Sequence, residues 1–142
     1  MVVLAKKEDH TEVLEMAIKH SESLGLPVDM EKANKFVKNI IENKTVIVHE
    51  SKKAMLAFVV SEWLLSDAYR TSVEVSFWVE PELRSQGVAG QLIDFYTSYC
   101  EGNKIDSITM AHMNDKYGTI AGDIYMKKGF KLKELYYTLE NK

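Results

Sequence analysis

The apolar residues of this chain repeat with two periods, and the changes between them mark the predicted elements. In four segments they recur three or four positions apart, which is the spacing of one face of an α-helix. We expect the first helix to be capped by Asp9 or Thr11 and to end before Gly25, and the second to follow a cap at Asp29 and run to Ile41. The other two helices are expected at residues 86–101 and 115–128.

Between these segments the apolar residues alternate with polar ones or form short continuous runs, which is typical of strands. The strands are expected at residues 1–5, 45–49, 54–65, 70–80, 105–113 and 131–139. The chain contains no repeat, low-complexity segment or linker. The resulting order predicts one domain over residues 1–142 of the α/β class, with a mixed, mostly antiparallel central sheet flanked by four helices.

Composition narrows the classes of partner. A hydrophobic content of 46% is enough for a full core, and the net charge of −3 gives nucleic acid no electrostatic attraction. The single cysteine, Cys100, cannot form an internal disulfide, which suits a reducing cytoplasm. Lys6 and Lys7 interrupt the apolar start, and the longest apolar run, residues 54–60, is far shorter than the ~20 residues a bilayer requires. We therefore expect a cytoplasmic protein that binds neither membrane nor nucleic acid.

A glycine-containing turn separates the strand predicted at residues 70–80 from the following helix. Its pattern is Arg84-x-x-Gly87-x-Ala89. A turn of this kind at a helix N-terminus can bind phosphate, because unpaired amides and the positive end of the helix dipole, roughly +0.5 charge, face the anion. Gly87 would allow a positive φ or a close approach of the backbone. An ordinary strand-to-helix turn is the alternative interpretation.

A second informative segment ends the helix predicted at residues 115–128. It reads Tyr125-Met126-Lys127-Lys128-Gly129-Phe130, with Gly129 where a C-cap glycine belongs. In this order the two segments resemble the Gcn5-related N-acetyltransferase family, whose motifs are R/Q-x-x-G-x-G/A after the fourth strand and Y-x-K-x-G-F at the last helix. The resemblance implies that family's fold over essentially the whole chain, acetyl-CoA as cofactor and acetyl transfer to an amine.

The resemblance also implies a cofactor site. The backbone of Phe77, Trp78 and Val79 would bind the pantetheine arm. The turn that would take the pyrophosphate comprises Arg84, Ser85, Gln86, Gly87, Val88, Ala89 and Gly90. The family often carries an asparagine two helical turns before the tyrosine, where this chain has Gly118. The nearest asparagine, Asn114, is a candidate for cofactor binding or for capping the last helix.

Acyl transfer to an amine needs a proton for the departing thiolate and a neutral amine as nucleophile. The resemblance makes Tyr125 the general acid, and a phenol with pKa near 10 carries its proton at neutral pH; a core tyrosine is the alternative. Glu74 and His112 are the candidate general bases. Strand alternation puts Glu74 opposite the face of Val73 and Val75, so an active site on that face requires a β-bulge. A solvent-facing strand glutamate is the alternative for Glu74, and a hydrogen-bonded structural histidine is the alternative for His112.

The acceptor is expected to be a primary amine of a small molecule or protein, because carboxylates are frequent in the first two helices and beside the turn. Lysines share these helices, so a solvated mixed-charge face is the alternative. His10, His20 and His49 lack metal-ligand spacing, and no metal site is expected. A coenzyme A-binding sensor or interaction module that has lost catalysis stays open as a second function, and so does a homodimer.

Overall fold

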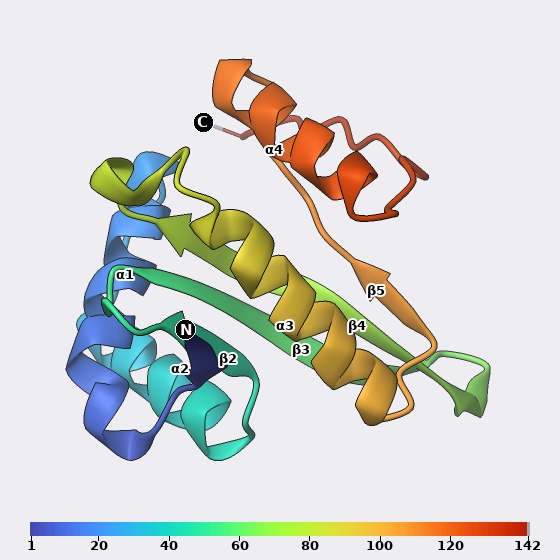
Figure 1. Ribbon diagram of the computed structural model, residues 1–142, viewed down its shortest axis with the longest axis horizontal. Helices are drawn as coiled ribbons and strands as arrows, with labels where there is room; N and C mark the ends of the chain where they lie inside the picture. Colours follow the sequence, from blue (N-terminus) through green and yellow to red (C-terminus); the bar gives the residue numbers. More distant parts are fainter. Residues whose placement is uncertain (142) are drawn as a thin grey trace. The chain divides into compact units, whose positions relative to one another are not determined.

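The computed structural model describes residues 1–141 and divides into two compact units, residues 1–110 and residues 111 onward. The first unit holds most of the secondary structure (Figure 1). Its helices are α1 (His10–Ser23), α2 (Met30–Glu42) and α3 (Val88–Gly102), with short 3-10 turns at Lys7–Asp9 and Pro81–Leu83. Its strands are β1 (Val2–Leu4), β2 (Val46–His49), β3 (Ala54–Trp63), β4 (Ser66–Val79) and β5 (Ser107–Thr109). Among the described residues, no helix is long and apolar enough to cross a membrane.

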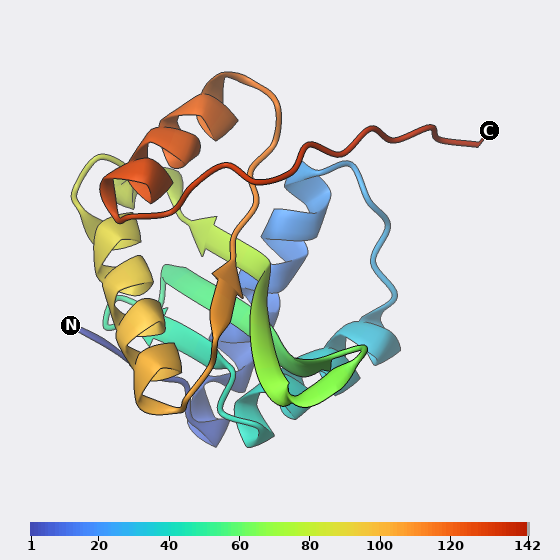
Figure 2. The same cartoon turned by 90° about the vertical axis from the view of Figure 1, so that its right-hand side faces the viewer.

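The five strands form one sheet in the order β1-β2-β3-β4-β5. The first four are antiparallel and β5 is parallel to β4, which confirms the predicted mixed, mostly antiparallel sheet. The parallel pairing joins only Thr71–Val73 of β4 to Ser107–Thr109 (Figure 2). Within residues 1–110, β4 therefore has a strand neighbour on one side only from Glu74 to Val79.

Helices cover both faces of this sheet. On one face α1 and α2 bury residues such as Val13 and Val37 against Val48 and Met55 of β2 and β3. On the other face lies α3, whose buried Tyr96 has its ring centroid 4.6 Å from that of Phe58 on β3 (Figure 1). The alternation of β3 thus supplies two apolar layers, which explains its continuous run of buried residues.

A β-bulge interrupts the alternation of β4. Ser76 is paired with Ala57 of β3, but the next β3 residue, Phe58, is paired with Glu74, so Val75 is the extra residue. Ser72 bonds Tyr96 of α3, whereas Ser76 bonds His20 of α1. Two serines four positions apart would share a face in a regular strand, and the bulge places them on opposite faces.

The second unit contains α4 (Lys116–Lys127) followed by an extended segment. The strand predicted at residues 131–139 is wrong, because residues 130–141 form no strand. Their apolar side chains are exposed at Leu132, Leu135, Tyr136, Tyr137 and Leu139. The strand predicted at residues 105–113 shrinks to β5. An alternating pattern predicts which side chains would share a face of a strand. A strand also needs a neighbouring strand for its backbone hydrogen bonds, and the pattern does not show whether one is available.

Candidate functional site

The turn between β4 and α3 has the backbone that an anion site requires. Gly87 is the N-cap of α3 with φ +78°, and Ser85 also has a positive φ, +70°. A Cβ placed on Gly87 would meet no atom of the described residues within 4 Å. The glycine is therefore needed for its backbone conformation, as the sequence predicts, and not for space.

The backbone amides in the first turn of α3 have no hydrogen-bond acceptor within the helix. No side chain caps Gly87, and the amide of Gln91 is the one that bonds the Gly87 carbonyl, at 3.1 Å. The amides of Val88, Ala89 and Gly90 precede this bond, so they have no acceptor inside the helix. With the helix dipole of a 15-residue helix behind them, they form a suitable site for a phosphate.

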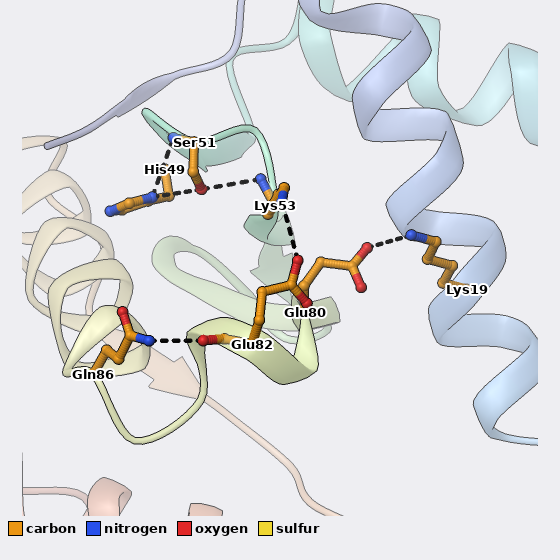
Figure 3. A network of polar contacts seen from close by, with 7 residues as sticks. All are labelled: Lys19, His49, Ser51, Lys53, Glu80, Glu82 and Gln86. Carbon is orange, nitrogen blue, oxygen red and sulfur yellow. Dashed lines mark hydrogen bonds and ion pairs between the residues drawn. The ribbon is translucent and has the colours of Figure 1, made fainter.

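Two carboxylates beside this turn are neutralised by lysines. Glu80 pairs with Lys19 of α1, and Glu82 pairs with Lys53 of the β2–β3 connection at 3.0 Å (Figure 3). The Gln86 side chain donates to the Glu82 carbonyl at 2.7 Å, which closes the turn on itself. An anion at the turn would therefore meet paired carboxylates, whose repulsion the lysines largely offset.

Arg84 is folded back on the end of β4. Its Nε donates to the Val79 carbonyl at 2.8 Å, and its guanidinium carbon lies 5.1 Å from the centre of the Trp78 ring. These contacts fix the turn to the strand. That Arg84 adds charge at a phosphate stays a prediction.

The free side of β4 offers a row of backbone groups. Phe77, Trp78 and Val79 pair with β3 through one edge, and no strand of residues 1–110 occupies the other. An extended amide-containing chain can bind such an edge as an added strand would. The Val79 carbonyl already accepts from Arg84.

In the second unit, Tyr125 is buried on α4 and its hydroxyl donates to the Ala111 carbonyl at 2.9 Å. The segment from Tyr125 to Phe130 is a helix C-cap of the Schellman type. The Phe130 amide donates to the Tyr125 carbonyl at 3.0 Å, the Gly129 amide donates to the Met126 carbonyl at 3.1 Å, and Gly129 has φ +95°. The Tyr125 and Phe130 rings lie 6.0 Å apart. Capping thus accounts for the tyrosine ring, the glycine and the phenylalanine, but not for the tyrosine hydroxyl.

Comparison of the whole structure with solved structures shows which fold this is. A probable acetyltransferase matches with a TM-score of 0.79 and 19% identity over 100% of this chain and 98% of its own. A predicted acetyltransferase with acetyl-CoA from Clostridium acetobutylicum matches with a TM-score of 0.73 and 17% identity, over 99% of this chain and 95% of its own. The chain has the Gcn5-related N-acetyltransferase fold. No family model and no curated protein sequence matches it.

The same acetyltransferase fold also occurs in a protein described as a transcriptional regulator from Bacillus halodurans. Its TM-score is 0.76 at 17% identity, over 99% of each chain. At such identities the likeness establishes the fold, and activity has to be argued from the site.

Within this acetyltransferase fold, the bulge decides which side chains of β4 share a face with Glu74. Glu74 shares the α3 face with Ser72, whose hydroxyl is 2.6 Å from that of Tyr96, and the extra Val75 moves Ser76 to the opposite face. Burial raises the pKa of Tyr96, and the nearby charge of Glu74 adds to the rise. The bulge that the sequence analysis required is present, and it places Ser76, not Glu74, on the face of α1 and α2.

The other predicted residues lie in the second unit. The exposed His112 ring packs against α4, where a Cβ on Gly122 would approach its Nε2 to 2.7 Å, and its Nδ1 is 2.8 Å from the Met113 carbonyl. Asn114 does not cap α4, because Asp115 accepts from the Gly118 amide at 2.7 Å. An aspartate one residue closer to the helix has the reach for the N3 amide. The cofactor role of Asn114 stays a prediction.

One polar pair was missed by sequence reasoning. His20 Nδ1 lies 2.9 Å from the hydroxyl of the buried Ser76. In the sequence the histidines suggested only a test for metal-ligand spacing. Because 56 residues separate His20 from Ser76, no local pattern joins them. The alternation of β4 with a bulge at Val75 was the one signal that could have brought them to the same face.

Proposed function

We propose that the chain is an N-acetyltransferase that transfers an acetyl group from acetyl-CoA to a primary amine. The observation that carries the proposal is the juxtaposition, within residues 1–110, of an open strand edge at Phe77–Val79 with the uncapped amides that begin α3. The edge suits the two amides of a pantetheine arm and the turn suits its pyrophosphate, so the residues fit this cofactor. The reduced, buried Cys100 agrees with a cytoplasmic enzyme.

In this proposal different residues of the chain bind the cofactor and supply the proton. Bound acetyl-CoA supplies the acetyl group as a thioester. The amides of Val88, Ala89 and Gly90 would hold the pyrophosphate, and the edge of β4 would orient the arm. Tyr125 supplies the proton that the departing sulfur requires. Its hydroxyl proton is directed at the Ala111 carbonyl in this structure, so donation requires a change of acceptor.

Lysines offset part of the carboxylate charge that would attract an amine. The carboxylates named above are paired, Glu80 with Lys19 and Glu82 with Lys53, and Glu31 of α2 pairs with Lys35 at 3.2 Å. Exposed pairs of this kind leave little net field. The long-range attraction of an amine is therefore weaker than the number of carboxylates in these helices suggests.

Thermal unfolding with and without acetyl-CoA tests the proposal, with a Gly87→Glu variant beside it. A ligand at about 100 times its Kd stabilises by roughly 2.7 kcal/mol, which raises Tm by several degrees. The glutamate places a negative charge in the turn, so the shift should vanish in this variant. Gly25→Glu is the matched control, because Gly25 has φ +70° and equally open surroundings. It should lose similar stability and keep the shift; loss of the shift in both variants would contradict a site at the turn.

A coenzyme A-binding module without catalysis is the second candidate. Two observations favour keeping it: the regulator with the same fold, and the engagement of the Tyr125 hydroxyl by a carbonyl. A thermal shift with acetyl-CoA but no thiol release across varied amines would favour this module over the enzyme.

A further inference from the structure

A hollow of about 410 Å³ lies on the face of the sheet that α1 and α2 cover. Its walls come from α1, the connection to α2, α2 itself and β4, all within residues 1–110. Three of its apolar side chains are strongly exposed, Leu26 at 54%, Phe36 at 36% and Val75 at 40%. A concave apolar surface with a few convergent polar groups is typical of small-molecule sites.

The polar groups of the hollow meet at β4. His20 and Ser76 both line it and are 2.9 Å apart through Nδ1 and Oγ. The ring of Trp78, two residues further along β4, has its centroid 6.5 Å from that of His20. Its indole Nε1 is buried and has no hydrogen-bond acceptor among the described residues. A buried donor without an acceptor is costly. The ring that carries it neighbours the imidazole, although Trp78 is not among the residues that line the hollow.

We propose that this hollow binds the acetyl acceptor as an amine with an apolar body, and that His20 takes a proton from the amine nitrogen. The inference rests on the proposed function and deepens it. It requires the tautomer in which Nδ1–H donates to Ser76 Oγ, which leaves the Nε2 lone pair as the proton acceptor. His20 thereby replaces Glu74 and His112 as the general base, and Ser76 positions its ring.

The charges around the hollow favour a monoamine over a polycation. Asp29 and Lys32 line it from the side of α2, and Lys19 next to His20 is paired with Glu80 beyond the end of β4. Asp29 and Lys32 are the formally charged residues of the lining and offset each other, so the lining has no excess of carboxylates to hold several ammonium groups. Apolar contact with Leu26, Phe36 and Val75 supplies the affinity instead.

The protons balance in the following way. A primary ammonium that becomes an amide loses two protons; the sulfur gains one, and the other leaves to solvent. His20 Nε2 receives the exported proton as the N–C bond forms, when the nitrogen becomes strongly acidic. Burial lowers the pKa of His20, so its ring is neutral and able to accept at neutral pH. The first proton of the ammonium leaves to solvent before the neutral amine attacks, and the second leaves through His20. The C–S bond breaks as the sulfur takes its proton from Tyr125, whose phenolate regains a proton from solvent, so that one proton is released overall.

The test measures thiol release from acetyl-CoA with 2-phenylethylamine and with spermidine as acceptors. We expect the wild type to prefer 2-phenylethylamine. His20→Gln should lower kcat by about 10²-fold or more, the usual contribution of a general base. It should also remove the acidic limb of the kcat/KM profile below about pH 6.5. Ser76→Ala should lower kcat less and leave KM unchanged, because it affects the tautomer and orientation of the ring.

The wall of the hollow is tested separately. Leu26→Ser should raise the KM for 2-phenylethylamine several-fold. Leu65→Ser changes a more exposed leucine of the β3–β4 hairpin, outside the hollow, and should leave this KM unchanged. Tm and the acetyl-CoA shift establish that each variant is folded and binds cofactor.

The outcomes separate the two proposals. Transfer that persists in His20→Gln with an unchanged pH profile overturns the role of His20 and leaves the enzyme intact. A preference for spermidine overturns the proposal that the acceptor has an apolar body, and it also leaves the enzyme intact. Cofactor binding without thiol release from either amine in the wild type overturns the enzyme and this inference together. The inference is supported if His20→Gln lowers kcat and removes the acidic limb, and if Leu26→Ser raises KM.

Discussion

Gly118 shows how one residue can oppose a general propensity. It lies near the start of α4, where alanine would normally be favoured over glycine by about 1 kcal/mol. A Cβ at this position would lie 1.5 Å from the Met113 carbonyl oxygen, so the backbone before α4 would have to move. The space that a side chain would take at this position is therefore occupied by the main chain before α4.

Gly118→Ala is expected to loosen α4 in spite of the better helix propensity. Gly102→Ala, at the end of α3 with open space around it, is the matched control and should be neutral or stabilising by up to about 1 kcal/mol. Amide hydrogen exchange over Lys116–Lys127 measures the first effect. Unchanged exchange in Gly118→Ala would mean that the close approach of Met113 is not maintained in solution.

Tyr125 carries two roles that a single substitution separates. The ring belongs to the C-cap with Phe130, whereas the hydroxyl donates to Ala111. Tyr125→Phe keeps the ring and should cost about 1 kcal/mol for the lost hydrogen bond. If the hydroxyl is the general acid, kcat should fall by about 10²-fold or more while the Kd for acetyl-CoA is unchanged. The exposed Tyr117 of α4 supplies the control, and Tyr117→Phe should retain full activity.

At the scale of elements, the sequence predicted each of the helices and the first five strands, because amphipathic periods and caps are local. Asp29 accepts from the Lys32 amide at 3.0 Å, as its position before α2 predicts. The bulge at Val75 was named as a condition but not located, since one extra residue leaves the pattern of β4 looking regular. The strand at residues 131–139 failed because pairing is a non-local property.

The features of the candidate site that depend on local sequence were predictable, and those that depend on distant segments were not. The positive φ of Gly87 follows from the turn alone, and so does the cap at Gly129. The pairing of His20 with Ser76 depends on α1 and β4 meeting across the sheet. The apolar stripe of α2 is longer than the part of it that the fold buries. Val37 and Ile40 are buried, whereas Met30 and Phe36 are exposed. Periodicity predicts the apolar face of a helix but not how much of it a neighbour covers.

The caps of α2 and α4 give a paired prediction at this scale. Asp115→Ala removes the acceptor of the Gly118 amide and should cost about 1 kcal/mol, like the loss of the cap in Asp29→Ala. Hydrogen exchange followed by mass spectrometry should show faster exchange at the start of α4 in the first variant and at the start of α2 in the second. Exchange that rises equally in both helices for either variant would contradict local capping.

At the scale of the whole molecule, charge and burial combine in the pH dependence of stability. Burial lowers the pKa of His20 from its ordinary value of 6.5, so the unfolded chain binds a proton more readily than the folded one. The stabilising effect is fully present above pH 6.5 and is lost as the pH falls below it. Carboxylates held by lysines act in a lower range: although burial alone would raise the pKa of Asp9, bonds from Lys52 and the Lys6 amide hold it below 3.8.

The free energy of unfolding should therefore decrease between pH 7 and pH 5 by an amount that depends on His20. His20→Asn should flatten this decrease, whereas His10→Asn, which changes a partly exposed histidine bonded to Asn34, should preserve it. Denaturant unfolding at several pH values measures both, and the slope with pH reports the difference in bound protons directly. If the two variants had equal slopes, the His20 imidazole would be no more buried in solution than that of His10. The hollow on the face of α1 and α2 would then be more open to water than the structure shows, and a neutral base there would need another cause.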